Sequence, residues 1–164
     1  MAPRQKPGRS EQEVRTPPEF LTAVKCLLGT KGFGIDLAAS KENATAPSYF
    51  TEDDDSLNID WAGYIGISAW AWLNPPYAHI EPWVKKAAKE RRHLSNYAGI
   101  AMLVPASTGA NWWRDYVDRT AHVLLLNGRL TFVGHTAPYP KDCALLLYSL
   151  QHPPSYEVWS WAKG

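Results

Sequence analysis

Short apolar segments alternate with helix-forming segments along most of this 164-residue chain. Apolar runs predict strands at residues 33–39, 70–73, 100–104 and 122–126, and apolar residues at helical spacing predict helices at 19–28, 80–93 and 111–120. Two further apolar runs, 130–133 and 144–148, predict a terminal strand pair joined by the loop 135–141. This alternation predicts a single α/β domain with a largely parallel central sheet and an antiparallel terminal strand.

The segments at either side of these elements set the expected domain limits. Residues 1–15 are basic and proline-containing, and we expect a flexible tail there, which leaves 16–164 as one folded domain. Residues 40–63 are polar, with an acidic cluster at 52–55, and predict a loop with short helical turns. In open parallel sheets, ligands bind at the carboxyl ends of the strands, so the loops after each strand are the candidate site.

The string Asn74-Pro75-Pro76-Tyr77 directly follows the apolar run 70–73. Two prolines fix the backbone and lack N–H groups, so nearby carbonyl oxygens are available to a ligand. The Asn74 side-chain oxygen and the Pro75 carbonyl can accept both hydrogens of a planar amino group and aim its lone pair at a methyl sulfonium. Tyr77 offers a face for an extruded base. The motif indicates methyl transfer to an amino nitrogen; a strand terminator or a proline-rich ligand are alternative interpretations.

Charge and cysteine usage narrow the function classes. With 17 Lys and Arg against 16 Asp and Glu, a strongly basic protein that coats a polyanion is excluded, whereas local basic patches suffice for an enzyme that must leave DNA after turnover. Cys26 and Cys143 lie in apolar sequence without a CxxC pair or secretory signal, so we expect reduced, buried thiols. No apolar run approaches the roughly 18 residues that span a bilayer. We expect a cytoplasmic protein with no membrane partner.

Further segments, in order around the motif, resemble the phage-type DNA N6-adenine methyltransferases, a Dam-like family that depends on S-adenosylmethionine. The similarity covers about residues 16–148, and its pieces are 16–20, 34–39, 43–44, 49–51, 57–61, 72–77, 103–106, 112–113 and 128–132. The resemblance implies a single-domain, Rossmann-like methyltransferase fold, double-stranded DNA as partner, and the bacterial host cytoplasm as location if the chain is phage-encoded. It also implies that the target adenine is flipped and methylated directly on its exocyclic amino group.

The resemblance also implies a cofactor site. Asp36 and Ala38 resemble the cofactor strand of these enzymes, although no G-x-G follows, and Thr16-Pro17 resembles the segment beside the methionine carboxylate. Asp60-Trp61 is expected to hold the adenosine. The expected cofactor-binding residues are Thr16, Pro17, Asp36, Ala38, Asn43, Asp60 and Trp61. A turn or cap role for Asp36, and a plain helix N-cap at Thr16-Pro17, remain alternatives.

The target base and DNA are expected to contact a second set of residues. Phe132 corresponds to a second aromatic beside the flipped base in related enzymes, with a core Phe as the alternative. The expected DNA-contacting residues are Tyr77, Phe132, Arg129, Trp112 and Arg114. Arg129 suits a phosphate or a structural partner. Loops 62–71 and 134–141 are expected to read the DNA sequence.

Other activities follow from the motif alone and stay open at this stage. N4-cytosine, RNA adenine and protein glutamine methylation use the same amino chemistry, and a non-catalytic DNA-binding module is a further alternative. A C5-cytosine methyltransferase is disfavoured because neither cysteine follows a proline.

The run from Asp53 to Asp55 contains no metal-ligating residue other than aspartate, so no metal is expected. Without a separate target-recognition domain, we expect short or relaxed sequence recognition by a monomer or homodimer.

Overall fold

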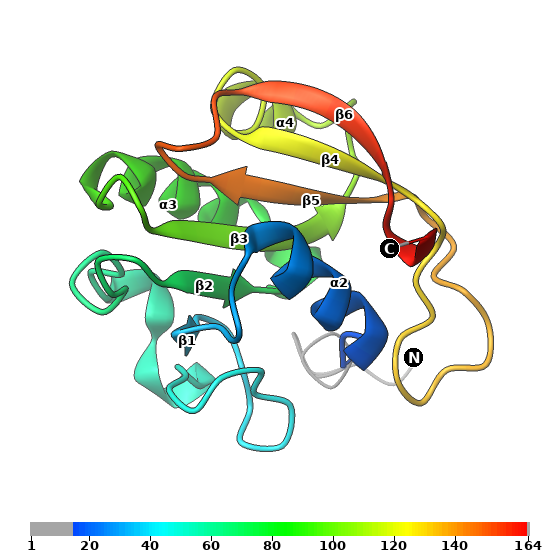
Figure 1. Cartoon of the computed structure of the whole chain (residues 1–164), viewed down its shortest axis with the longest axis horizontal. Coiled ribbons are helices and arrows are strands. Elements are labelled where there is room, and N and C mark those ends of the chain that lie inside the picture. Colours follow the sequence, from blue (N-terminus) through cyan, green and yellow to red (C-terminus); the bar gives the residue numbers. More distant parts are fainter. Residues whose placement is uncertain (1–14, 164) are drawn as a thin grey trace, which may run out of the picture.

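The computed structural model describes residues 15–163, which form a six-stranded mixed sheet with helices on both faces (Figure 1). The strands are β1 (Ile35–Asp36), β2 (Trp70–Leu73), β3 (Gly99–Pro105), β4 (His122–Asn127), β5 (Cys143–Tyr148) and β6 (Ser155–Ser160). Their order in the sheet is β1-β2-β3-β5-β4-β6. β5 runs antiparallel to both of its neighbours, whereas β1 with β2, β2 with β3, and β4 with β6 are parallel pairs.

Three α-helices cover this sheet in the described chain. They are α2 (Pro18–Leu28) on one face, and α3 (Glu81–Glu90) and α4 (Asn111–Tyr116) on the other (Figure 1). Short 3₁₀ turns occur at Glu52–Asp54, Ser56–Asn58, Tyr77–His79, Arg91–His93 and Trp161–Lys163. As the sequence predicts, α2 has a proline in its first turn and ends at Gly29, whose φ of 67° lies in the left-handed region.

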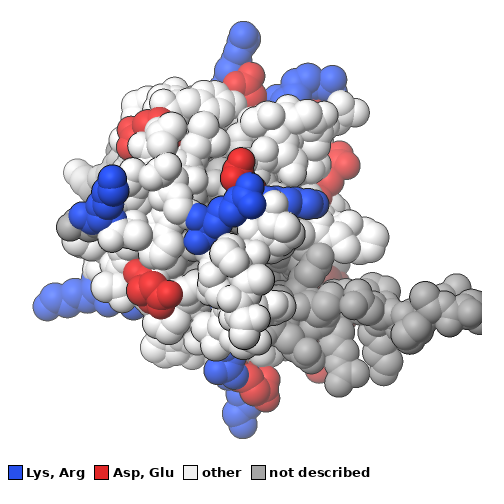
Figure 2. All heavy atoms as spheres, turned by 90° about the vertical axis from the view of Figure 1, so that its right-hand side faces the viewer, with Lys and Arg blue, Asp and Glu red and all other residues white. Residues whose placement is uncertain are grey.

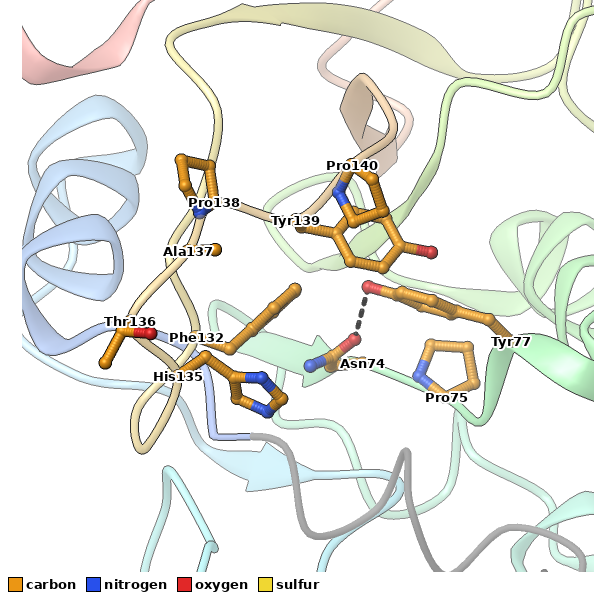
Figure 3. Close-up of a pocket in the computed structure, with 10 residues that line it drawn as sticks. All are labelled: Asn74, Pro75, Tyr77, Phe132, His135, Thr136, Ala137, Pro138, Tyr139 and Pro140. Carbon is orange, nitrogen blue, oxygen red and sulfur yellow. Dashed lines mark hydrogen bonds between the residues drawn. The ribbon is translucent and has the colours of Figure 1, made fainter.

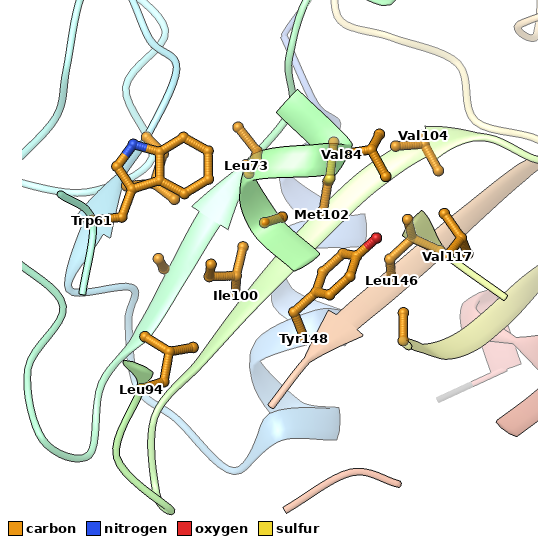
Figure 4. Close-up of a cluster of buried hydrophobic side chains, with 14 of the residues drawn as sticks. Trp61, Leu73, Val84, Leu94, Ile100, Met102, Val104, Val117, Leu146 and Tyr148 are labelled. Atoms are coloured by element: carbon orange, nitrogen blue, oxygen red, sulfur yellow. The ribbon is translucent and has the colours of Figure 1, made fainter. Parts of the chain in front are cut away.

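Both faces of the central strands are buried, which explains why their sequences are continuously apolar. Successive side chains of a strand point to opposite faces. On the α3 and α4 side, Ile100 and Met102 join Val84 in one cluster (Figure 4). On the α2 side, Ala101 and Leu103 join Phe20 in another. A parallel region covered in this way holds the loops after β1 and β2 on a rigid support.

Several predicted elements are confirmed, some with different limits. β2 has the predicted bounds, and β3, β4 and β5 are each one or two residues longer than predicted. β1 is shorter than predicted: the Leu37 N–H still donates to the Trp72 carbonyl of β2, and on its other side the Asp36 backbone pairs with Ser48 and Phe50. α4 ends before residue 120, and Arg119, with a φ of 60°, has a backbone that a right-handed helix does not allow.

The predicted terminal strand pair is wrong. Residues 130–133 form no strand; Leu130 and Phe132 are buried against the α2-side core, and Val133 makes an isolated bridge with Arg15. β5 is instead inserted between β3 and β4. β6 was not predicted, because its residues are mostly exposed and follow two prolines, so they carry little apolar pattern.

Two smaller expectations have mixed outcomes. Cys143 is buried as expected, but Cys26 is exposed on α2; both are free thiols. The predicted tail over residues 1–15 lies outside the described residues, apart from Arg15. Within residues 15–163, no helix combines the length and apolar character needed to cross a bilayer.

Candidate active site

The Asn74-Pro75-Pro76-Tyr77 motif lies at the carboxyl end of β2, between this strand and the turn that leads into α3. Because β1, β2 and β3 are parallel, the segment after Asp36 lies at the same edge of the sheet. The chain therefore brings the motif and residues 37–39 together, as the rule for open parallel sheets predicts.

The motif separates two cavities. The first, which we call the aromatic cavity, has a volume of about 390 Å³. Its lining residues are Asn74, Pro75, Tyr77, Phe132, His135, Thr136, Ala137, Pro138, Tyr139 and Pro140 (Figure 3). The second, which we call the acidic cavity, has a volume of about 250 Å³. Its lining residues are Leu37, Ala38, Ala39, Thr51, Glu52, Asp55, Ser56, Leu57, Pro76, His79 and Trp83. Asn74, Pro75 and Tyr77 thus line the aromatic cavity, and Pro76 lines the acidic cavity.

Three aromatic rings surround the Asn74 side of the aromatic cavity (Figure 3). The Tyr139 ring centroid lies 6.1 Å from that of Tyr77 and 5.5 Å from that of Phe132, both in edge-on geometry. The loop that carries Tyr139 is held in place where its backbone N–H donates to the Leu130 carbonyl at 2.7 Å. The predicted Phe132 lies in the cavity, whereas Tyr139 was missed; its only sequence signal is a tyrosine between two prolines.

The side-chain amide of Asn74 has a defined partner at each end. Its Nδ2 donates to Thr16 Oγ1 at 3.2 Å, and its Oδ1 accepts from the Tyr77 hydroxyl at 2.8 Å (Figure 3). Thr16 is not the N-cap of α2; Pro17 has that position, and no side chain caps the helix. The amide oxygen therefore lies on the side of the aromatic cavity.

The acidic cavity is walled by the two 3₁₀ turns of the acidic loop. Thr51 donates from its N–H and hydroxyl to Asp54, which closes the first turn, and the Asn58 amide donates to Asp55 at 2.6 Å. Glu52 and Asp55 belong to the acidic cluster of the predicted loop, and they line this cavity. Trp83, on α3, forms another part of the wall and stacks on Trp61, with 6.2 Å between the two ring centroids.

Asp36 is buried, with an exposed fraction of 2%, and it lines neither cavity. Its carboxylate accepts the Ala38 N–H at 3.2 Å, and the N–H and hydroxyl of Thr45 at 3.0 and 2.9 Å. Burial raises the pKa of Asp36 to about 6, although these hydrogen bonds act to lower it. The residue holds the loop after β1, so the structure shows the turn role for it.

The raised pKa of Asp36 predicts a pH effect on stability. A folded-state pKa above the ordinary value gives stability that is present at low pH and lost as the pH rises through about 6. When the pH is lowered from 7 to 5, the unfolding free energy of the wild-type protein should therefore rise by about 1 kcal/mol relative to that of Asp36→Asn, which cannot titrate. Urea unfolding of both proteins at the two pH values measures this difference. If the unfolding free energies of the two proteins depended on pH in the same way, the raised pKa of Asp36 would be contradicted.

Of the other predicted cofactor residues, only Ala38 lines the acidic cavity in the described chain. Asn43 closes a turn by accepting the Ser40 N–H at 2.6 Å. Trp61 is fully buried, and its indole N–H donates to Ser56. Asp60 lines a separate depression with Lys89, Glu90 and His93. Of the seven residues, Ala38 lines the acidic cavity, and Thr16 reaches the motif through Asn74.

The predicted DNA-contacting residues beyond the cavity are spread out. Arg129 is exposed and pairs with Asp142 at 3.3 Å, and Arg114 is exposed and pairs with Asp115 at 2.8 Å. Trp112 packs half-buried against the core on the α4 side. Figure 2 views the face toward which β2 and β3 point, and the described part of it has scattered charges of both signs rather than a continuous basic stripe.

The described residues hold no group of three or more His, Cys, Asp or Glu side chains that is arranged to hold a metal ion.

Comparison with known proteins identifies the family of the chain. A profile of the DNA N-6-adenine-methyltransferase (Dam) family matches residues 5–144. The chain belongs to this family. The matched range includes every residue that lines the two cavities, so both cavities lie within the region that the chain shares with this family.

Two phage relatives carry the same description. The chain is 28% identical over 116 residues to a DNA N-6-adenine-methyltransferase of Escherichia phage T1, a match that covers 71% of this chain and 45% of the relative. It is 27% identical over 112 residues to a DNA N-6-adenine-methyltransferase of Haemophilus phage HP1, with 67% and 60% covered. This Dam-family chain therefore spans about half of the length of these relatives.

Proposed function

We propose that this chain transfers a methyl group from S-adenosylmethionine to the N6 amino group of adenine in double-stranded DNA, with release of S-adenosylhomocysteine and of one proton from the amino nitrogen. One observation carries the proposal: the Asn74-Pro75-Pro76-Tyr77 motif forms part of two cavities at once. A methyl donor in one cavity and a flipped base in the other would meet at the motif. The phage relatives, which are named for this reaction, support the choice of adenine in DNA.

The acidic cavity has a composition that fits S-adenosylmethionine. When bound, the cofactor supplies an electrophilic methyl group on a positively charged sulfonium. Ala38 and Ala39 are small, so a ligand can approach the backbone there, and the Glu52 and Asp55 carboxylates suit its cationic groups and hydroxyls. Trp83 offers an aromatic wall. In this proposal the roles expected for Asp60 and Trp61 belong to Asp55 and Trp83, while Asp36 and Asn43 shape the wall.

The aromatic cavity is proposed to take the target adenine. An amino group inside a duplex is out of reach, so the base must be extruded, and Tyr77, Phe132 and Tyr139 offer apolar ring surface for it. Asn74 Oδ1 and the Pro75 carbonyl accept the two hydrogens of the amino group. The lone pair of the nitrogen is then directed toward the Pro76 side of the motif. Preorganised acceptors of this kind act by positioning and electrostatics.

Two features of the site bear on substrate entry. The Tyr77 hydroxyl donates to Asn74 Oδ1, so the incoming amino group replaces this hydrogen bond. The loop over residues 135–140 forms one side of the cavity, which makes it the proposed reader of the bases beside the target. Arg129 precedes this segment in the chain, and we assign it a phosphate contact, whereas Trp112 and Arg114 line neither cavity.

Labelled methyl transfer tests the proposal. The purified protein is incubated with tritium-labelled S-adenosylmethionine and duplex DNA from a strain without adenine methylation, and the DNA is digested to nucleosides. We expect the label in N6-methyldeoxyadenosine. Label in N4-methyldeoxycytidine would move the acceptor to cytosine, since the amino chemistry is shared. Cofactor binding without transfer to any base of DNA would contradict the proposed function.

A further inference from the structure

Thr16 and Asn74 are 58 positions apart in the chain, yet their side chains share a hydrogen bond at the edge of the aromatic cavity. Thr16 is 7% exposed, so its hydroxyl has little access to water. α2 does not use this hydroxyl, because the helix begins after Pro17 without a side-chain cap. The Thr16 hydroxyl is therefore directed to the motif rather than to its own helix.

The contact matters because the two ends of an amide are chemically opposite. An Asn side chain offers an acceptor oxygen on one side and a donor NH₂ on the other. Only the oxygen can accept a hydrogen from an exocyclic amino group. With Thr16 accepting from Nδ2, the oxygen is presented on the opposite side, where it meets the Tyr77 hydroxyl (Figure 3).

Loss of the Thr16 oxygen would change this preference. The partly buried Nδ2 would have no acceptor at residue 16, and an unsatisfied buried donor is costly. The amide could regain a partner by turning its NH₂ toward the aromatic cavity, where a tyrosine hydroxyl can accept as well as donate. In that orientation Asn74 presents a donor to the amino group of the substrate, and the two donors repel.

The backbone around Thr16 holds its hydroxyl in place from both sides. On one side, the Pro17 carbonyl accepts the N–H groups of Phe20 and Leu21 in the first turn of α2. On the other side, the Arg15 carbonyl accepts the Val133 N–H at 3.0 Å, next to Phe132 of the aromatic cavity. Thr16 is thus fixed relative to the helix and to the cavity wall.

We propose that Thr16 is a positioning residue for methyl transfer, which selects the orientation of the Asn74 amide by accepting from its Nδ2. This inference rests on the proposed function, in which Asn74 accepts from the target amino group. Its contribution is to the rate of transfer rather than to the affinity for either substrate.

Steady-state kinetics of matched variants test the inference. Thr16→Val keeps the shape but removes the oxygen, Thr16→Ser keeps the oxygen, and Thr22→Val makes the same change on the exposed side of α2. We expect Thr16→Val to lower kcat about 10- to 100-fold, with KM for DNA and for S-adenosylmethionine within about threefold. Thr16→Ser and Thr22→Val should stay close to wild type. If Thr16→Val instead raises KM for S-adenosylmethionine at unchanged kcat, Thr16 contacts the cofactor and the positioning role is overturned.

A second measurement does not depend on activity. NMR of the Asn74 side-chain NH₂, identified by its loss in Asn74→Ala, reports whether Nδ2 is hydrogen-bonded. We expect exchange with water to be about tenfold slower in the wild type and in Thr16→Ser than in Thr16→Val, or in Thr16→Ala if the valine variant does not fold. Equal exchange in all of them would overturn the inference even if methyl transfer is confirmed. Unequal exchange without transfer to DNA would show that the contact forms, but it would refute the proposed function and with it the role of Thr16 in transfer.

Discussion

Replacing Asn74 with alanine is expected to lower the rate of methyl transfer to adenine by about a thousandfold, the largest effect of any single change in this chain. The substitution removes one of the two acceptors proposed to hold the target amino group, and it also removes a hydrogen-bond partner of Thr16 and of Tyr77. Because Asn74 is only partly buried and follows β2, the fold should persist. Labelled transfer, with the melting temperature recorded alongside, measures both effects.

A matched change far from the motif controls for this result. Asn96 is exposed in the turn before β3, at the opposite end of the strand from the candidate site, so Asn96→Ala should retain full transfer. If Asn74→Ala kept wild-type activity, the proposed mechanism would be refuted whatever the behaviour of the control.

Ala38→Leu and Ala137→Leu should have opposite consequences, because the two alanines line different cavities. A leucine at position 38 occupies part of the acidic cavity and should weaken S-adenosylmethionine binding about 10- to 100-fold, or about 1.4 to 2.7 kcal/mol. A leucine at position 137 occupies part of the aromatic cavity. It should leave cofactor affinity within about threefold and should lower the rate of transfer instead.

Calorimetry with S-adenosylmethionine, followed by transfer assays at saturating cofactor, separates the two outcomes. Each variant is the control of the other, since both add the same three carbon atoms at an alanine of a loop. Reversed phenotypes would exchange the assignments of the two cavities. If neither variant altered binding or transfer, neither cavity would hold a substrate.

Local sequence was sufficient for the centre of the sheet and for the place of the Asn74-Pro75-Pro76-Tyr77 motif at the end of β2. The limits of β2 were predicted because an apolar run ends at two prolines, which terminate a strand by their own covalent structure. α2 was predicted for a similar reason, from a proline at its start and a glycine beyond its end. Such signals act over a few residues and do not need the rest of the chain.

Edge and loop elements were harder to predict, because their pairing is decided by partners far along the chain. β5 was predicted as a strand, but its place between β3 and β4 depends on where those strands lie. Likewise, Trp61 and Trp83 look alike as aromatic residues of the sequence. Packing buries the Trp61 ring completely and leaves Trp83 on the cavity wall.

The sequence by itself determined that a buried strand ends at Asn74-Pro75-Pro76-Tyr77, and it predicts that the motif binds an amino group, since both inferences rest on the residues themselves. Tertiary structure alone decided that the motif divides two cavities, that Asp55 and Trp83 line one of them and Tyr139 the other, and that Thr16 holds the Asn74 amide. These contacts join residues from separate segments. Their geometry exists only after the sheet has brought the carboxyl ends of its strands together.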